Sequence, residues 1–243
     1  MRDFTGKRYW LIGASDGLGA ALAKDLSKAG ATVILSARNQ AALDKVAREV
    51  SGPCSVVPVD VQDDEGIASA VDTIGEVDGI VYLAGVYWPM AAQDWDHSKA
   101  LAMIDVNFTG AMRVLGHVLP SMITRNSGHV VLTGSLSAYR GLPAAIGYSA
   151  SKAGLLGLAE SLYYDLKSTN VDVQIAHPGF IKTRLTDKND FKMPSIMTPE
   201  IASGHMMIHM QSKSFNCAFP RPFSWVFRGA QFLPNWLYYR LFS

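Results

Sequence analysis

Three glycines near the N-terminus constrain the fold more than any other feature of this sequence. They are spaced G-x-x-x-G-x-G, and they separate an apolar run at Arg8–Ile12 from a helix-forming run that begins at Leu18. A strand that turns into a helix through residues without Cβ lets the backbone approach a pyrophosphate at the positive helix end. The spacing alone does not separate a dinucleotide site from an ordinary glycine-rich turn, but the position of the glycines after a strand and at the start of a helix favours the dinucleotide site. The residues of this candidate site are Gly13, Ser15, Asp16, Gly17, Leu18 and Gly19.

Short β-branched runs alternate with longer helical stretches along most of the chain. The expected strands are Arg8–Ile12, Thr32–Ser36, Ser55–Val59, Gly79–Leu83, His129–Thr133 and Val171–Ala176, with a short last one at Ser214–Phe219. The expected helices are Leu18–Lys28, Gln40–Val50, Asp64–Ile74, Ser98–Thr124 and Tyr148–Ser168. Alternation at this spacing predicts an α/β fold with a doubly wound, mostly parallel sheet and helices on both faces. The 243 residues show no internal repeat or linker, so one domain over 1–243 is expected.

The end of the second expected strand bears on the choice of cofactor. Folds that bind NAD usually place an acidic residue here for the ribose 2′-hydroxyl, whereas this chain has Ala37 and then Arg38. An arginine suits a 2′-phosphate, and a missing carboxylate removes its repulsion. NADP(H) is therefore favoured over NAD(H), although Asp16 in the glycine loop is a counter-argument because it could face the extra phosphate.

A tyrosine and a lysine four residues apart form the second informative motif. On a helix, Tyr148 and Lys152 share one face. A phenol is a poor base at neutral pH, and a neighbouring ammonium lowers its pKa, so such a pair can pass a proton to or from an alcohol oxygen. Ser135 ends the fifth expected strand, at the edge where doubly wound sheets bind ligands. It is placed to hydrogen-bond the same oxygen.

With these motifs, residues 7–183 resemble the short-chain dehydrogenase/reductase family in its compact single-domain, Rossmann-type form. The resemblance implies that Tyr148 is the general acid/base and that Lys152 binds the nicotinamide ribose and lowers the pKa of Tyr148. It implies that Ser135 polarises the substrate carbonyl. Asn107 matches the helix asparagine that holds a water in the proton relay.

The resemblance also supplies further cofactor contacts. Asp60, followed by Val61, matches the residue that contacts the adenine, and Ala84 and Gly85 match the end of the Asn-Ala-Gly motif beside the cofactor. The segment that closes over the nicotinamide amide is matched by Pro178, Gly179 and Thr183. The chain departs from the family pattern at Ile12, where threonine is frequent, and at Leu83, which replaces the asparagine of Asn-Ala-Gly.

Composition excludes several other classes of protein. The 22 Lys and Arg nearly balance the 21 Asp and Glu, so the formal charge of +1 gives no support for nucleic-acid binding. Two cysteines indicate a reducing compartment, and a cytoplasmic location is expected because neither a signal peptide nor a membrane-spanning run is visible. His205 and His209 are four residues apart, but no third ligand lies nearby, so no metal site is expected.

Two segments break the strand–helix alternation. Residues 184–213 are expected to be the substrate loop, and residues 220–243 form a tail rich in aromatic residues and interrupted by prolines. So much apolar surface is expected to be buried on its own domain, on another subunit or at a membrane surface. Packing on protein is favoured, with peripheral membrane contact as the alternative. Because the family commonly forms dimers or tetramers, a homo-oligomer is expected.

The sequence therefore predicts an NADP(H)-dependent oxidoreductase that interconverts a carbonyl and a secondary alcohol of a small molecule by hydride transfer. One alternative is a non-catalytic NADP(H)-binding or interaction protein on the same fold. The other is an acyl-carrier ketoreductase, for which Lys182, Arg184, Lys188 and Lys192 are candidate docking residues.

Overall fold

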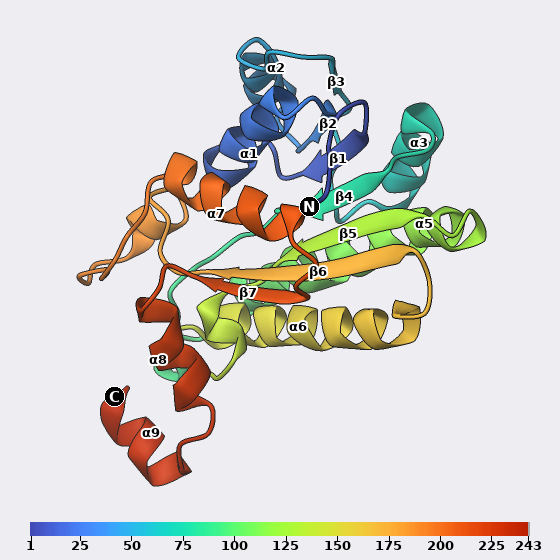
Figure 1. Ribbon diagram of the computed structural model, residues 1–243. Coiled ribbons are helices and arrows are strands. Elements are labelled where there is room, and N and C mark those ends of the chain that lie inside the picture. The colour runs from blue at the N-terminus through green and yellow to red at the C-terminus, as the bar shows by residue number, and fades with distance from the viewer. Residues whose placement is uncertain (243) are drawn as a thin grey trace.

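The computed structural model describes residues 1–242 and shows one seven-stranded sheet (Figure 1). The strand order is β3-β2-β1-β4-β5-β6-β7, and every neighbouring pair is parallel. The strands are β1 Arg8–Ile12, β2 Thr32–Ser36, β3 Cys54–Val56, β4 Gly79–Tyr82, β5 Gly128–Thr133, β6 Val171–Pro178 and β7 Asn216–Phe219. The predicted doubly wound, Rossmann-type α/β fold is confirmed.

Helices cover both faces of the sheet. The α-helices are α1 Gly17–Lys28, α2 Gln40–Ala47, α3 Asp64–Ile74, α4 His97–Ile104, α5 Gly110–Thr124, α6 Ile146–Leu166, α7 Pro199–Gln211, α8 Phe223–Ala230 and α9 Asn235–Leu241. Short 3-10 turns lie at Ala92–Asp94, Leu136–Ala138 and Thr186–Lys188, and a π-turn, η2, lies at Asp105–Thr109. Because the crossovers place helices on both sides, the strands are buried on both faces and read as continuous apolar runs.

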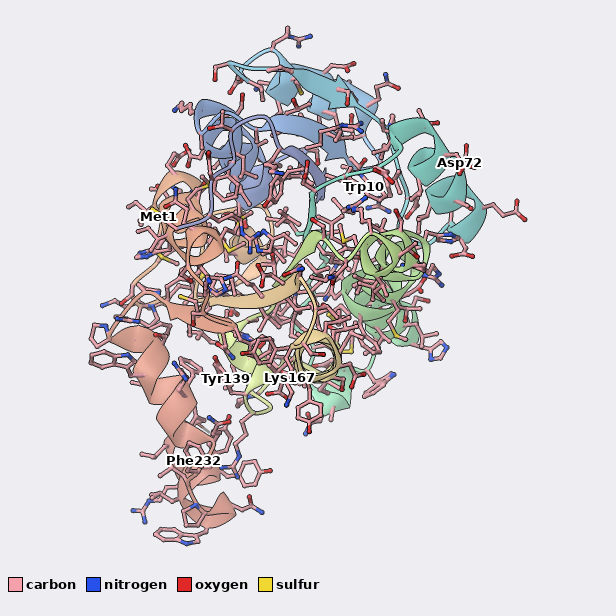
Figure 2. The ribbon with its side chains drawn as sticks, turned by 45° about the vertical axis from the view of Figure 1, so that its right-hand side comes forward. Met1, Trp10, Asp72, Tyr139, Lys167 and Phe232 are labelled. Carbon is pink, nitrogen blue, oxygen red and sulfur yellow. The ribbon has the colours of Figure 1, made fainter. Side chains whose placement is uncertain are left out.

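Alternate residues of a strand belong to different apolar cores. Trp10 and Ile12 of β1 pack with α3, α5 and α6, whereas Tyr9 and Leu11 pack with α1, α2 and α7. Trp10 is completely buried between the sheet and its helices (Figure 2). This period-two division fixes the register of the strands, because a slip of one residue would exchange the two cores.

The ends of three elements differ from the expected ones, because of a proline, a neighbouring strand or a π-turn. The edge strand β3 ends at Val56 rather than Val59, and Pro58 has no N–H to donate to a ladder. Strand β6 continues to Pro178 because its last residues pair with β7. The expected helix Ser98–Thr124 is a run of α4, the π-turn and α5.

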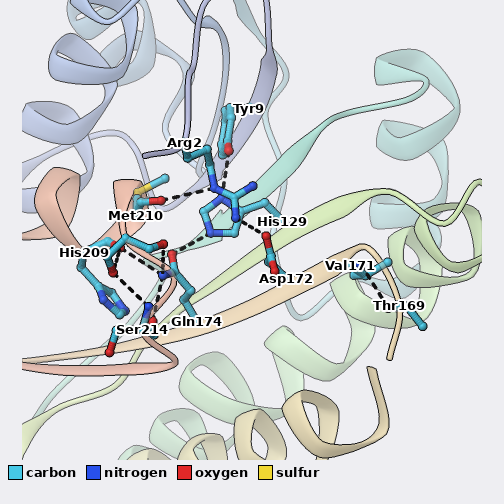
Figure 3. Close-up of polar contacts among 11 residues, drawn as sticks. Arg2, Tyr9, His129, Thr169, Val171, Asp172, Gln174, His209, Met210 and Ser214 are labelled. Carbon is cyan, nitrogen blue, oxygen red and sulfur yellow. Dashed lines mark hydrogen bonds and ion pairs between the residues drawn. The ribbon is translucent and has the colours of Figure 1, made fainter. Parts of the chain in front are cut away.

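A buried hydrogen-bond network connects β1, β5, β6 and the end of α7 (Figure 3). His129 lies between the Tyr9 hydroxyl, 2.8 Å from Nδ1, and Gln174 Oε1, 2.8 Å from Nε2. The Gln174 amide nitrogen donates to the backbone oxygens of His209, Ser212 and Ser214, which it holds at the C-terminal end of α7. Burial lowers the pKa of His129 to about 3, so the imidazole is neutral in the folded protein at neutral pH.

We expect this histidine to make the stability of the fold depend on pH. Below about pH 6.5 the unfolded chain binds a proton that native His129 does not, so stability falls as pH decreases from 6.5 toward the folded pKa. The loss for this one group is about 2 kcal/mol between pH 6.5 and pH 5. Urea unfolding at both pH values should therefore show a smaller pH dependence for His129→Gln than for the wild type. Equal losses in the two proteins would contradict this assignment.

Candidate active site

A cleft of about 820 Å³ opens at the carboxyl edge of the sheet, where β1 and β4 lie side by side. The order in which strands are added reverses at this point. From β1 the chain adds β2 and β3 on one side, and it then adds β4, β5, β6 and β7 on the other side. Doubly wound sheets bind ligands at such a switch point. The glycine loop after β1, the end of β2 and the ends of β4, β5 and β6 all contribute to the walls.

The glycine turn is shaped so that side chains are excluded from its inner surface. Gly13 has a φ of 98°, and a Cβ on Gly19 would lie 2.2 Å from the Gly13 carbonyl oxygen. The Asp16 side chain accepts a hydrogen bond of 2.8 Å from Gly17 N and caps the start of α1. The backbone amides at the N-terminus of α1 therefore face a space that no side chain of the turn fills. Such a space fits the phosphates of a dinucleotide.

Two arginines flank the cleft on the glycine-loop side. Arg38 is exposed at the rim and makes no hydrogen bond or ion pair with other residues in the range 1–242. Arg184 donates from Nε to Asp16 Oδ2 at 2.6 Å. Sequence reasoning raised Asp16 as a source of repulsion toward a 2′-phosphate, but in the structure this carboxylate is paired.

Tyr148 and Lys152 lie on the first turns of α6 and both line the cleft. Lys152 is buried, its Nζ donates to the Thr133 carbonyl at 2.8 Å, and it lies 5.8 Å from the centre of the Tyr148 ring. Burial lowers the pKa of Lys152 to about 8. The edge of the Tyr87 ring packs against Tyr148 with 5.0 Å between centroids.

The Tyr148 phenol is held in its protonated form. Burial raises the pKa of Tyr148 to about 12, and a hydrogen bond with Ser135 opposes that shift without reversing it. The resemblance led us to expect a lowered pKa through Lys152, whereas the pKa of Tyr148 in the structure is raised by burial. The Lys152 ammonium donates to the Thr133 carbonyl and lies 5.8 Å from the centre of the Tyr148 ring.

Asn107 lies in the π-turn behind the cleft wall and is completely buried. Its Oδ1 accepts from Val86 N at 2.7 Å, and its Nδ2 donates to Val86 O and to Ser151 Oγ, both at 3.0 Å. The amide therefore fixes the chain after β4 to the start of α6. Leu83 replaces the asparagine of the family motif, but the chain after Leu83 is fixed at Val86 by the hydrogen bonds from Asn107.

The structure brings all sixteen candidate cofactor-binding residues to one cleft. These are Gly13, Ser15, Asp16, Gly17, Leu18, Gly19, Arg38, Asp60, Val61, Ala84, Gly85, Tyr148, Lys152, Pro178, Gly179 and Thr183. Of the four candidate catalytic residues, Tyr148 and Lys152 line the cleft, whereas Ser135 and Asn107 are not part of its wall. Ser135 lies beside Tyr148 and lowers the pKa of its phenol.

Three residues near the site were not predicted to act there. Tyr87 lies in an irregular loop without any sequence signal, and Arg184 was considered only as a docking residue. His177 is buried and its Nδ1 lies 2.9 Å from the Ser135 carbonyl oxygen. The only sequence signal for Arg184 is that it follows Thr183 directly.

The two histidines of α7 have different surroundings. The ring of His205 stacks on Phe219 with 5.0 Å between ring centroids, and the side chain of His209 is buried. Within residues 1–242, no group of three or more His, Cys, Asp or Glu side chains is arranged to hold a metal ion.

Known proteins resemble this chain in sequence and in fold. Residues 7–193 match the sequence profile of the family described as short chain dehydrogenase. An uncharacterized oxidoreductase of Myxococcus xanthus is 34% identical, covering 98% of this chain and 97% of the relative. A 3-oxoacyl-(acyl-carrier-protein) reductase of Rickettsia conorii is 30% identical, covering 84% of this chain and 85% of the relative.

A solved structure extends the comparison over the whole chain. The crystal structure of a short chain dehydrogenase from Burkholderia cenocepacia in complex with NADP has a TM-score of 0.89 at 22% identity, with both chains covered completely. At this identity the likeness concerns the fold. The sequence match and the architecture agree, and the chain is an oxidoreductase that belongs to the short-chain dehydrogenase/reductase family.

Proposed function

We propose that this oxidoreductase interconverts a carbonyl and a secondary alcohol of a small molecule with NADP(H), using Tyr148 as the general acid/base. The proposal rests on Tyr148 and Lys152, which line the same cleft as the glycine turn, and on Ser135, which lies close enough to Tyr148 to lower its pKa. The nicotinamide cofactor, when bound, supplies or accepts a hydride at the carbonyl carbon. The protein's own residues orient the oxygen and move the proton.

Ser135 and Tyr148 are proposed to bind the same substrate oxygen. The Ser135 hydroxyl polarises a carbonyl there, and Tyr148 donates its proton as charge develops on the oxygen. Because the pKa of Tyr148 is raised to about 12, the phenol carries its proton at neutral pH.

Lys152 and Asn107 are proposed to support these two residues. With a pKa of about 8 the ammonium is still mostly charged at pH 7, and only one of its hydrogens is used by the Thr133 carbonyl. We propose that the other hydrogens bind the nicotinamide ribose. The role of Asn107 in holding a relay water stays a prediction, since its side chain is engaged by Val86 and Ser151.

The proposed cofactor is NADP(H) rather than NAD(H). Arg38 stands at the end of β2 without a partner in residues 1–242, and Asp16 is neutralised by Arg184. Both features suit a ligand with an extra phosphate. The Burkholderia dehydrogenase was solved with NADP, which agrees with this choice.

Replacing Arg38 tests the choice of cofactor. Loss of a charge-assisted arginine–phosphate contact should cost about 1.5–3 kcal/mol, roughly 10- to 150-fold in affinity. We expect Arg38→Ala to weaken NADPH by this factor and to leave NADH nearly unchanged in fluorescence titrations. Arg48→Ala, at an exposed position after α2, is the matched control and should change neither. Equal weakening of both nucleotides, or tighter wild-type binding of NADH, would contradict the proposal.

An acyl-carrier ketoreductase is the second candidate, and the Rickettsia relative favours it. Its docking surface would need free cations beside the cleft. Of the four candidate residues, Arg184 is paired with Asp16, and Lys188 donates to the Tyr87 carbonyl at 2.7 Å. Two of the four cations are thus used within the chain, which favours a free small-molecule substrate.

We also propose how the chain is organised, how it associates and where it is located. We propose a single domain over 1–243. The segment 184–213, expected to be the substrate loop, borders the cleft only at residues 184–186, and its residues 199–211 form helix α7, which packs in the core. A cytoplasmic homo-oligomer is proposed, and the free thiols of Cys54 and Cys217 agree with a reducing compartment.

A further inference from the structure

Helices α8 and α9 extend from the β7 edge of the sheet, away from the rest of the molecule (Figure 1). One side of these helices contacts the domain through hydrogen bonds and ring contacts of Arg140 and Tyr238. The Arg140 guanidinium donates to the carbonyls of Ala230 and Leu233 at 3.2 and 2.7 Å and lies 3.9 Å from the centre of the Tyr238 ring. Tyr238 is buried and donates to the Gly141 carbonyl at 2.7 Å. The tail therefore packs on its own domain through one side only.

The other side of the tail is apolar and faces solvent (Figure 2). Trp225 is 59% exposed, Phe232 83% and Trp236 69%, and Val226, Tyr239 and Leu241 are also exposed. Within α9, Trp236 and Tyr239 are three residues apart and share one face. Soluble proteins rarely leave several large aromatic side chains together in water, so this surface is suited to binding.

The charge of the same segment is of one sign. Residues 220–243 contain none of the chain's 21 acidic residues, but they contain Arg221, Arg228 and Arg240. All three arginines are exposed, and none takes part in an ion pair with the residues in 1–242. The tail is thus a basic, aromatic surface on a chain whose overall charge is near zero.

We infer that the outer face of α8 and α9 binds the surface of an anionic lipid bilayer. Tryptophan and tyrosine rings favour the headgroup level, and the arginines would meet lipid phosphates there. In a symmetric contact between two tails, by contrast, the arginines would find no acidic residue on the tail of the second copy. Binding is peripheral: the two helices have eight and seven residues. Among residues 1–242, no helix is long and apolar enough to cross a membrane.

Vesicle flotation of the full-length protein tests this inference without any use of catalytic activity. The probes are vesicles of phosphatidylcholine alone and vesicles of phosphatidylcholine with an equal part of phosphatidylglycerol. We expect binding to the anionic vesicles that weakens as salt is added. Trp225→Ser with Trp236→Ser should reduce the partition coefficient at least about tenfold. Arg228→Gln with Arg240→Gln should reduce it roughly fivefold for each arginine.

Matched changes elsewhere on the surface serve as controls. Trp95→Ser removes an exposed tryptophan outside the tail, and Lys45→Gln with Arg48→Gln removes two charges beside α2, at the opposite end of the molecule in Figure 1. Both should bind vesicles like the wild type. Absence of binding to the anionic vesicles would overturn the inference, as would equal losses in the controls. A wild-type oligomer that light scattering shows to dissociate in the tryptophan variant, with no vesicle binding, would identify a second copy as the occupant instead.

Discussion

Tyr148→Phe is expected to lower the turnover number by a factor of about 10² or more, as is typical when a general acid is removed. The substitution deletes one hydroxyl and keeps the ring that packs against Tyr87. Because the phenol carries its proton at neutral pH, the variant loses the proposed proton donor rather than a charge. NADPH affinity should be nearly unchanged. Steady-state turnover and a fluorescence titration of NADPH check the two halves of this expectation.

Tyr87→Phe is the matched control, because it makes the same chemical change in the neighbouring ring, 5.0 Å away. Its turnover should remain near that of the wild type. If Tyr148→Phe keeps near-normal turnover, or if the two variants lose activity equally, the assignment of Tyr148 as the general acid is wrong.

Gly19→Ala is expected to disrupt both the cofactor site and the stability of the fold. The new methyl group would lie 2.2 Å from the Gly13 carbonyl oxygen and 3.0 Å from Ala14 Cα, so the backbone of the turn has to move. Overpacking against backbone should cost at least about 3 kcal/mol. That cost corresponds to a melting temperature lower by roughly 6–12 °C for a chain of this size. NADPH affinity should fall by about 10² or more, because the amides of the turn no longer face the phosphates.

Gly157→Ala provides the comparison within the same chain. Gly157 lies on the exposed side of α6, and no atom lies within 4 Å of its ideal Cβ position. Alanine there should leave NADPH affinity unchanged and raise stability by up to about 1 kcal/mol. Thermal unfolding and NADPH titration of both variants check the pair. If both variants have the same melting temperature and the same NADPH affinity, the turn after β1 does not need glycine at position 19.

Local sequence patterns predicted the parts of the fold and site that depend on residues close together in the chain. The apolar runs predicted the strands of a sheet buried on both faces, and the glycine turn followed from its spacing and its position between a strand and a helix. The i, i+4 spacing placed Tyr148 and Lys152 together at the cleft. Each of these features is decided by a few neighbouring residues and by the periodicity of one element.

Features that depend on residues far apart could not be predicted in this way. Asp16 and Arg184 are 168 residues apart, and their ion pair exists only because two loops meet at the cleft. The direction of the Tyr148 pKa also required the structure, since it depends on which groups pack around the phenol in the fold. Likewise, the helices of the tail are positioned by Arg140, which no local pattern connects to Tyr238.

The boundary of one element shows how tertiary contacts override a local pattern. The helix predicted at Ser98–Thr124 contains a π-turn at Asp105–Thr109, in which Asn107 is turned toward Val86. Such turns occur frequently at functional sites. The residues from Asp105 to Gly110 are weak helix formers, but their pattern does not distinguish a π-turn from an α-helix.

The proposed hydride transfer is tested most directly with NADPH that carries deuterium at both positions of nicotinamide C4, incubated with the enzyme and a panel of ketones and aldehydes. We expect the wild type to produce an alcohol with deuterium on the former carbonyl carbon, and Tyr148→Phe to produce it at least about 10² more slowly. NADPH binding without transfer of deuterium to any member of a broad panel would show that the proposed reaction is wrong and would favour a non-catalytic NADP(H)-binding protein on the same fold.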